Sequence, residues 1–196
     1  MTAEDWVTHR PVLAHYLTPY TDVPGHETDD PFAILDWTDD EVFARILALM
    51  NERMVPGDVP LNLNATSLVT SAYCYTADER YQTWVLDYLD AWRERTERND
   101  GIMPDNVGPH GEIGERMDGR WWGGYYGWRW PHGAWILLES TLIAGANANL
   151  LTGDASWFDL HRSQSDLLWS LRETREGEVV VPFRHGANGW FDYRPM

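Results

Sequence analysis

The segment 99–133, NDGIMPDNVGPHGEIGERMDGRWWGGYYGWRWPHG, lies between two stretches of helix-like sequence and decides how the fold is interpreted. It holds four tryptophans, two tyrosines, nine glycines, three arginines and two histidines. Loops of this length inside a domain are uncommon, and disordered segments are poor in aromatic residues. The composition therefore predicts an ordered loop that forms a binding site. The alternative interpretation is an aromatic loop that only plugs the end of a helical fold.

The chain repeats a pair of helices around this loop, over residues 64–77 with 79–98 and again over 134–151 with 155–174. A shift of 76 residues aligns Thr76-Ala77-Asp78 with Thr152-Gly153-Asp154. The first helix of each pair is nearly apolar all round, which predicts that its neighbours bury it.

The N-terminal part of the chain is less regular. Four scattered prolines indicate an irregular segment over residues 1–37, with at most a short helix at Ala3–Tyr16. Thr38 followed by Glu41 then predicts a capped helix near 39–54, which ends before Pro56-Gly57.

The repeated inner and outer helices resemble the six-hairpin α/α toroids of many glycoside hydrolases and polysaccharide lyases. The resemblance implies an all-α fold, an incomplete α/α-hairpin toroid over residues 38–196, with hairpins at about 62–98 and 133–175. It implies that segments 99–133 and 177–196 lie side by side and line a cleft. Because these hairpins are too few to close a toroid, we expect a fragment, or an arc completed by missing sequence or other copies.

The resemblance implies cleavage of a poly- or oligosaccharide by hydrolysis or by β-elimination. Hydrolysis needs two carboxylates, whereas elimination needs a base such as tyrosine or histidine and groups that neutralise a uronate. The catalytic candidates are Tyr125, Tyr126, His132, Asp105, Asp118 and Glu115. The substrate-binding candidates are Asn106, Arg116, Arg120, Trp121, Trp122, Trp128, Arg129, Trp130, Arg184, His185 and Trp190. The alternative is a non-catalytic glycan-binding or scaffold arc, in which indoles stack on sugar and no residue titrates.

Composition limits the partners. With 31 acidic residues, 15 basic residues and a net charge of −16, the chain lacks the basic footprint that nucleic-acid binding needs. All basic residues are arginines, and the acid excess predicts that added salt stabilises the fold.

The remaining signals are negative. The first residues show no signal-peptide pattern, and the apolar run 134–151 carries Glu139, Asn147 and Asn149, so it indicates a core helix rather than a membrane span. The one cysteine, Cys74, is expected to be a small buried apolar residue. No motif predicts a metal site or a cofactor.

Overall fold

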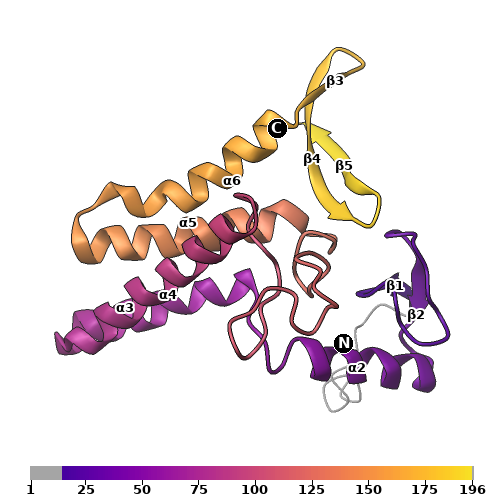
Figure 1. Ribbon diagram of the computed structural model, residues 1–196, viewed down its shortest axis with the longest axis horizontal. Helices are drawn as coiled ribbons and strands as arrows, with labels where there is room; N and C mark the ends of the chain where they lie inside the picture. Colours follow the sequence, from indigo (N-terminus) through magenta and orange to yellow (C-terminus); the bar gives the residue numbers. More distant parts are fainter. Residues whose placement is uncertain (1–14, 196) are drawn as a thin grey trace.

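Helix α5 (Gly133–Thr152) is the centre of the fold because its sequence is apolar on nearly every side. The computed structural model describes residues 15–195. Within that range, α5 contacts α3 (Thr66–Thr76), α4 (Glu79–Arg98) and α6 (Asp159–Ser170), as Figure 1 shows. Of the described helices, α5 is the one long and apolar enough to cross a membrane by length and composition. Its neighbours bury it only in part, because 39% of its apolar stretch is buried while Trp135 and Leu150 are exposed.

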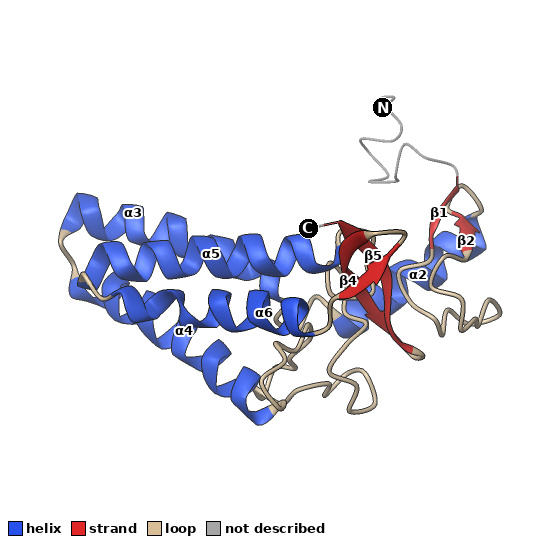
Figure 2. Ribbon diagram, turned by 90° about the horizontal axis from the view of Figure 1, so that it is seen from above, coloured by secondary structure: helices blue, strands red, loops and turns tan. Residues whose placement is uncertain are grey.

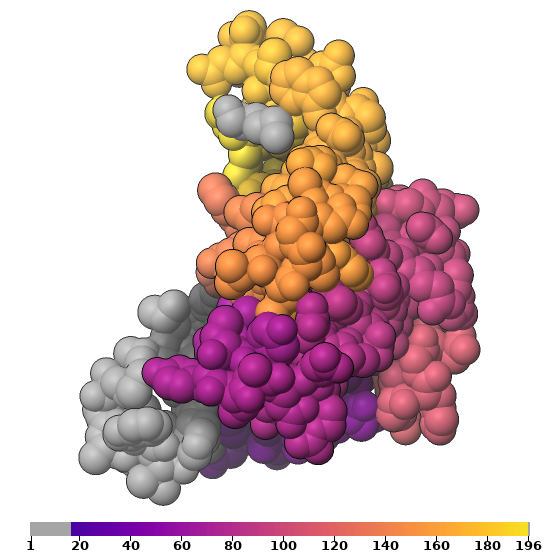
Figure 3. Space-filling model, turned by 90° about the vertical axis from the view of Figure 1, so that its left-hand side faces the viewer, coloured from indigo at the N-terminus to yellow at the C-terminus, as the bar shows by residue number. Residues whose placement is uncertain are grey.

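The helices form two hairpins, α3–α4 and α5–α6, whose connections are built alike. Ala77 and Gly153 end the first helix of each pair in the left-handed conformation, with φ of 53° and 75°. Asp78 and Asp154 then cap the following helix by accepting backbone N–H groups. The sequence repeat is therefore confirmed at its connections, and Figure 3 shows the α5–α6 pair stacked on the α3–α4 pair. Two short 3-10 helices, η1 (Pro60–Ala65) and η2 (Ala155–Phe158), precede α3 and α6.

A second, smaller body surrounds α2 (Asp40–Arg53), which confirms the helix expected near 39–54. Its cap is Asp39, whose carboxylate accepts the N–H groups of Glu41 and Val42, and not Thr38. Beside it, β1 (His15–Leu17) pairs antiparallel with β2 (Ile34–Asp36). The helix considered over Ala3–Tyr16 falls almost entirely outside the described residues.

The C-terminal region corrects the predicted fold class. The described part of segment 177–196, expected to form a cleft loop of an all-α toroid, and the end of the helix expected over 155–174 instead form a three-stranded antiparallel sheet. Its strand order is β3 (Glu173–Arg175), β4 (Glu178–Gly186), β5 (Gly189–Pro195), and α6 ends at Ser170. The run Val179–Val181 favours a strand, and Gly186 pairs with Gly189 across a two-residue turn. The fold is mixed α/β (Figure 2), so the likeness to toroids stops at the two helical hairpins.

Cys74 is a smaller correction, since it is exposed on α3 rather than buried. The side chains buried between the hairpins are instead large apolar residues of α4, α5 and α6, which include Leu89, Trp92, Leu137 and Leu168.

Candidate functional site

The loop between α4 and α5 is folded around one buried carboxylate, that of Asp105. Its two oxygens accept the backbone N–H groups of Gly123 (2.9 Å), Gly124 (2.8 Å) and Trp128 (2.8 Å). The side-chain amide of Asn106 donates a fourth bond, and the residue is 0% exposed. Burial raises the pKa of Asp105 to about 6. With no access to solvent, this predicted catalytic acid holds the loop together and does not face a substrate.

The glycines around Asp105 are needed because the backbone must approach it closely. A Cβ on Gly127 would lie 2.1 Å from Asp105 Oδ2, and one on Gly124 would lie 2.5 Å from the Asp105 carbonyl oxygen. No other residue type fits at these distances without displacement. The close approach to Asp105 thus requires Gly124 and Gly127, whereas Gly123 is favoured by its φ of 98°.

Two of the predicted sugar-binding indoles belong to the core. Trp128 is 0% exposed, and its Nε1 donates to the carbonyl oxygen of Met103 at 2.7 Å. Trp130 is buried among the residues around α2, with the ring centroid of Tyr125 at 4.5 Å. Tyr125 and Tyr126 pack edge to face at 4.4 Å, so both predicted bases take part in the same packing.

The other catalytic candidates lie in separate environments. Glu115 Oε1 lies 2.7 Å from His110 Nδ1, and this hydrogen bond lowers the pKa of Glu115. Asp118 sits on an exposed turn with φ of 54°, and His132 is exposed just before α5 without a capping bond. No pair of carboxylates flanking a cleft emerges from Asp105, Glu115 and Asp118.

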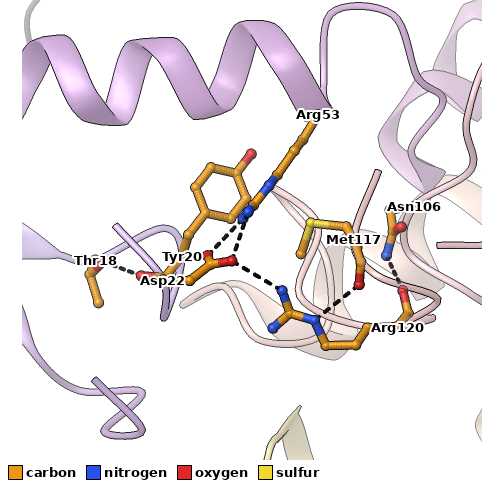
Figure 4. A network of polar contacts seen from close by, with 7 residues as sticks. All are labelled: Thr18, Tyr20, Asp22, Arg53, Asn106, Met117 and Arg120. Carbon is orange, nitrogen blue, oxygen red and sulfur yellow. Dashed lines mark hydrogen bonds and ion pairs between the residues drawn. The ribbon is translucent and has the colours of Figure 1, made fainter. Parts of the chain in front are cut away.

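Asn106 and Arg120 take part in a polar network that ties the loop to the N-terminal body (Figure 4). Arg53 of α2 donates two hydrogen bonds to Asp22, at 2.7 and 2.6 Å, which lower the pKa of that carboxyl. Arg120 Nη2 reaches the same carboxylate at 3.4 Å, while Asn106 Nδ2 donates to the Arg120 carbonyl oxygen. Arg116 is exposed on the same loop.

The loop contacts the C-terminal segment, as predicted, and four aromatic rings form this contact. Trp121, Trp122, His185 and Trp190, here called the aromatic patch, are each partly exposed. The His185 ring lies 4.6 Å from that of Trp121, 5.6 Å from Trp122 and 4.8 Å from Trp190. The backbone N–H of His185 donates to the Trp128 carbonyl oxygen, which joins strand and loop.

His185 is chemically unusual within the aromatic patch. Burial lowers its pKa to about 4, so the imidazole is neutral at physiological pH. Its Nδ1 has no hydrogen-bond partner among the described residues.

The opposite face of the β4–β5 hairpin carries buried positive charge. Arg184 lies between the rings of Phe32 and Phe191, at 5.0 and 4.8 Å, and its Nε donates to the Arg129 carbonyl oxygen. Arg129 is 2% exposed, and burial together with repulsion from Arg184 lowers its pKa to about 10. Both arginines were sequence candidates, but Phe32 and Phe191 were missed because no motif connects them.

In the part of the chain that the structure describes, no group of three or more His, Cys, Asp or Glu side chains is arranged to hold a metal ion.

Comparison with known proteins gives a family without an assigned function. No curated protein and no solved structure shows a significant match to the chain. Residues 1–180 match the model of a family described as a domain of unknown function, DUF8034, and this range includes the helices and the aromatic loop. Because the match spans most of the 196 residues, the chain belongs to the DUF8034 family.

Proposed function

We propose that the protein binds a carbohydrate on the aromatic patch. The observation that carries this proposal is the convergence of Trp121 and Trp122, from the loop, with Trp190 of β5 around the His185 ring. Indole faces are flat, apolar and rigid, and they stack on the C–H faces of pyranoses at a low cost in side-chain entropy. Partly exposed rings can make that contact, whereas the buried Trp128 and Trp130 cannot.

Binding is favoured over bond cleavage by the state of the titratable groups. A base with a pKa near the working pH transfers protons best, and His185, with a pKa of about 4, is too weak a base for that task. Asp105 has the raised pKa of an acid but is enclosed by backbone amides. At the aromatic patch, non-catalytic recognition therefore agrees with these two groups better than hydrolysis or elimination does, and the candidate bases Tyr125, Tyr126 and His132 lie outside the patch.

The test is a titration of tryptophan fluorescence with neutral and uronic polysaccharides, supported by calorimetry. Replacing one stacked indole, in Trp122→Ala, should weaken binding about tenfold, the equivalent of about 1.4 kcal/mol. Trp169→Ala is the matched control, because Trp169 is 46% exposed on α6, outside the aromatic patch. Equal losses in both variants, or no binding by the wild type, would refute the proposal.

Cleavage is tested on the same polysaccharides by measuring new reducing ends and the absorbance of unsaturated products. We expect neither signal from the wild type. Turnover that disappears in His132→Ala while affinity remains would instead support the catalytic alternative.

A further inference from the structure

A cleft of about 480 Å³ lies where the turn of the β4–β5 hairpin meets the β1–β2 unit. Its walls include Phe32 and Phe191, whose rings are 5.6 Å apart, and Asn188 of the turn. Figure 1 shows the turn end of the hairpin beside β1 and β2. Arg129, from the loop before α5, forms part of the lining. The cleft thus brings together three segments that are distant in sequence.

Only one of the three guanidinium nitrogens of Arg129 has a hydrogen-bond partner in the described residues. Nη1 donates to the Thr18 carbonyl oxygen at 2.7 Å and fixes the orientation of the group. Nε and Nη2 are buried and have no hydrogen-bond partner within residues 15–195. Across the same range, neither Arg129 nor Arg184 forms an ion pair with a carboxylate. Asp22 and Asp30 attract this cation only from beyond ion-pair distance, and a buried cation without a direct partner is costly, so the arrangement favours an anion.

The two unused nitrogens form one edge of the guanidinium fork. That edge accepts both oxygens of a carboxylate through two parallel hydrogen bonds. The molecule itself provides the example: Arg194 donates from Nε and Nη2 to the two oxygens of Asp192, at 3.1 and 2.6 Å. In Arg129 the equivalent edge is buried and has no hydrogen-bond partner among residues 15–195, and the bond from Nη1 to Thr18 fixes its orientation.

We propose that this cleft binds a small monocarboxylate, which the unpaired Nε and Nη2 of Arg129 hold through two hydrogen bonds. Asp29 and Asp30 also line the cleft, so its outer part repels ligands with several negative charges. The phenyl rings of Phe32 and Phe191 offer an apolar wall to the ring of the ligand. The ligand class is therefore a ring-bearing monocarboxylic acid, either a free acid or a uronic acid unit of a glycan.

This site is independent of the proposed function. Arg184 pairs with Phe191 and His185 pairs with Trp190, and successive residues of a strand face opposite sides of the sheet. The cleft and the aromatic patch thus occupy opposite faces of β4–β5. Because Nε and Nη2 are shielded from solvent, the ligand must displace part of the cleft lining to reach them.

The test measures binding to the purified full chain by calorimetry with four probes: benzoate, D-glucuronate, D-glucose and inorganic phosphate. We expect both carboxylates to bind, glucose not to bind, and phosphate to bind more weakly than either carboxylate. Tighter binding of glucuronate than of benzoate would assign a uronic acid unit, and the reverse a free aromatic acid. Absence of carboxylate binding, or a preference for phosphate, would overturn the proposal.

Two variants and one control locate the site. Arg129→Gln should weaken carboxylate binding at least tenfold, whereas Arg172→Gln, at an exposed arginine near the end of α6, should not change it. Asp29→Asn changes an exposed residue of the lining and should strengthen phosphate binding, because it removes a negative charge. Unchanged carboxylate affinity in Arg129→Gln would refute the site, as would unchanged phosphate affinity in Asp29→Asn.

Discussion

Two buried charges from the same loop, Asp105 and Arg129, differ in how completely their hydrogen bonds are satisfied. Asp105 accepts four hydrogen bonds from neighbouring backbone and side-chain groups. Arg129 uses one of its three guanidinium nitrogens and leaves a complete edge without a partner in the described residues. A satisfied buried charge specifies local structure, whereas an unsatisfied one has a cost that a ligand can remove. The contrast separates a structural acid from a candidate binding residue.

The variant Asp105→Ala should have the largest effect and tests whether Asp105 is the structural member of the pair. It leaves three buried N–H groups, those of Gly123, Gly124 and Trp128, without an acceptor. At roughly 1–3 kcal/mol for each unsatisfied group, the free energy of unfolding should fall by about 3 kcal/mol or more. Urea denaturation measures the loss, with Asp87→Ala on the exposed face of α4 as the control. A loss no larger than that of the control would show that Asp105 is dispensable.

Gly127→Ala tests the same clamp without removing its charge. The added methyl group would lie 2.1 Å from Asp105 Oδ2, so the carboxylate or the backbone must move. We expect a loss of about 2 kcal/mol, within the range for overpacked sites. Gly153→Ala is a useful comparison, because a Cβ there meets no atom within 4 Å and only the left-handed φ of 75° causes strain. A smaller loss for Gly127→Ala than for Gly153→Ala would contradict the close approach.

Arg129→Gln should affect stability much less. It removes one hydrogen bond to Thr18 but also removes the cost of a buried cation with two unpaired nitrogens, so the two effects oppose each other. The free energy of unfolding should change by less than about 1 kcal/mol in the absence of ligand. A loss as large as that of Asp105→Ala would mean that Arg129 is a structural residue, and the comparison would fail.

Acid titration compares two carboxyl groups, those of Asp22 and Asp105, whose pKa values are shifted in opposite directions by the fold. Hydrogen bonds from Arg53 lower the pKa of Asp22 below 3.8, so its stabilisation is complete above that pH and is lost as the pH falls through the folded value. Asp105, with a pKa raised to about 6, instead adds stability as the pH falls from 6 towards 3.8.

Urea midpoints at pH 5 and pH 3 measure this effect. Asp22→Asn should lose less stability than the wild type between these two pH values, because the variant has no carboxylate at position 22 to protonate. An equal loss in both proteins would show that the ion pair with Arg53 contributes nothing to the acid sensitivity.

The smallest expected effect comes from salt, which acts on the surface and leaves both buried charges almost unscreened. At a net charge of −16, the melting temperature should rise by a few degrees between low and molar sodium chloride. Differential scanning fluorimetry measures it, and a flat or falling melting temperature would contradict the prediction.

Local sequence patterns predicted the helices but not the sheet. The left-handed residues Ala77 and Gly153 and the aspartates that follow them form bonds only with close neighbours in the chain. The sequence alone can therefore predict where the helices are connected. The run Val179–Val181 favours a strand, but the pairing of β4 with β5 depends on contacts between separate segments, and the toroid resemblance places β5 in a cleft loop. Two helical hairpins specify only their own local packing, so they do not imply the complete all-α toroid that the repeat suggests.

For the candidate site, the sequence predicted the meeting of the loop with segment 177–196 but not the role of each residue. Asp105 precedes Asn106 and follows Pro104, a setting typical of turns, and its partners are backbone amides that leave no pattern except glycine spacing. Phe32 lies in an irregular segment, and only the fold brings it to Phe191. Site residues from three segments cannot be grouped before their packing is known.

The clamp at Asp105 also affects how the chain folds. Its bonds to Gly123, Gly124 and Trp128 close loops of 18, 19 and 23 residues, and the entropy of closure must be lost before any of these bonds forms. The α3–α4 and α5–α6 hairpins need only short connections, so they can form first. In pulse-labelling hydrogen exchange, the amides of Gly123, Gly124 and Trp128 should therefore gain protection together, after those of the helices.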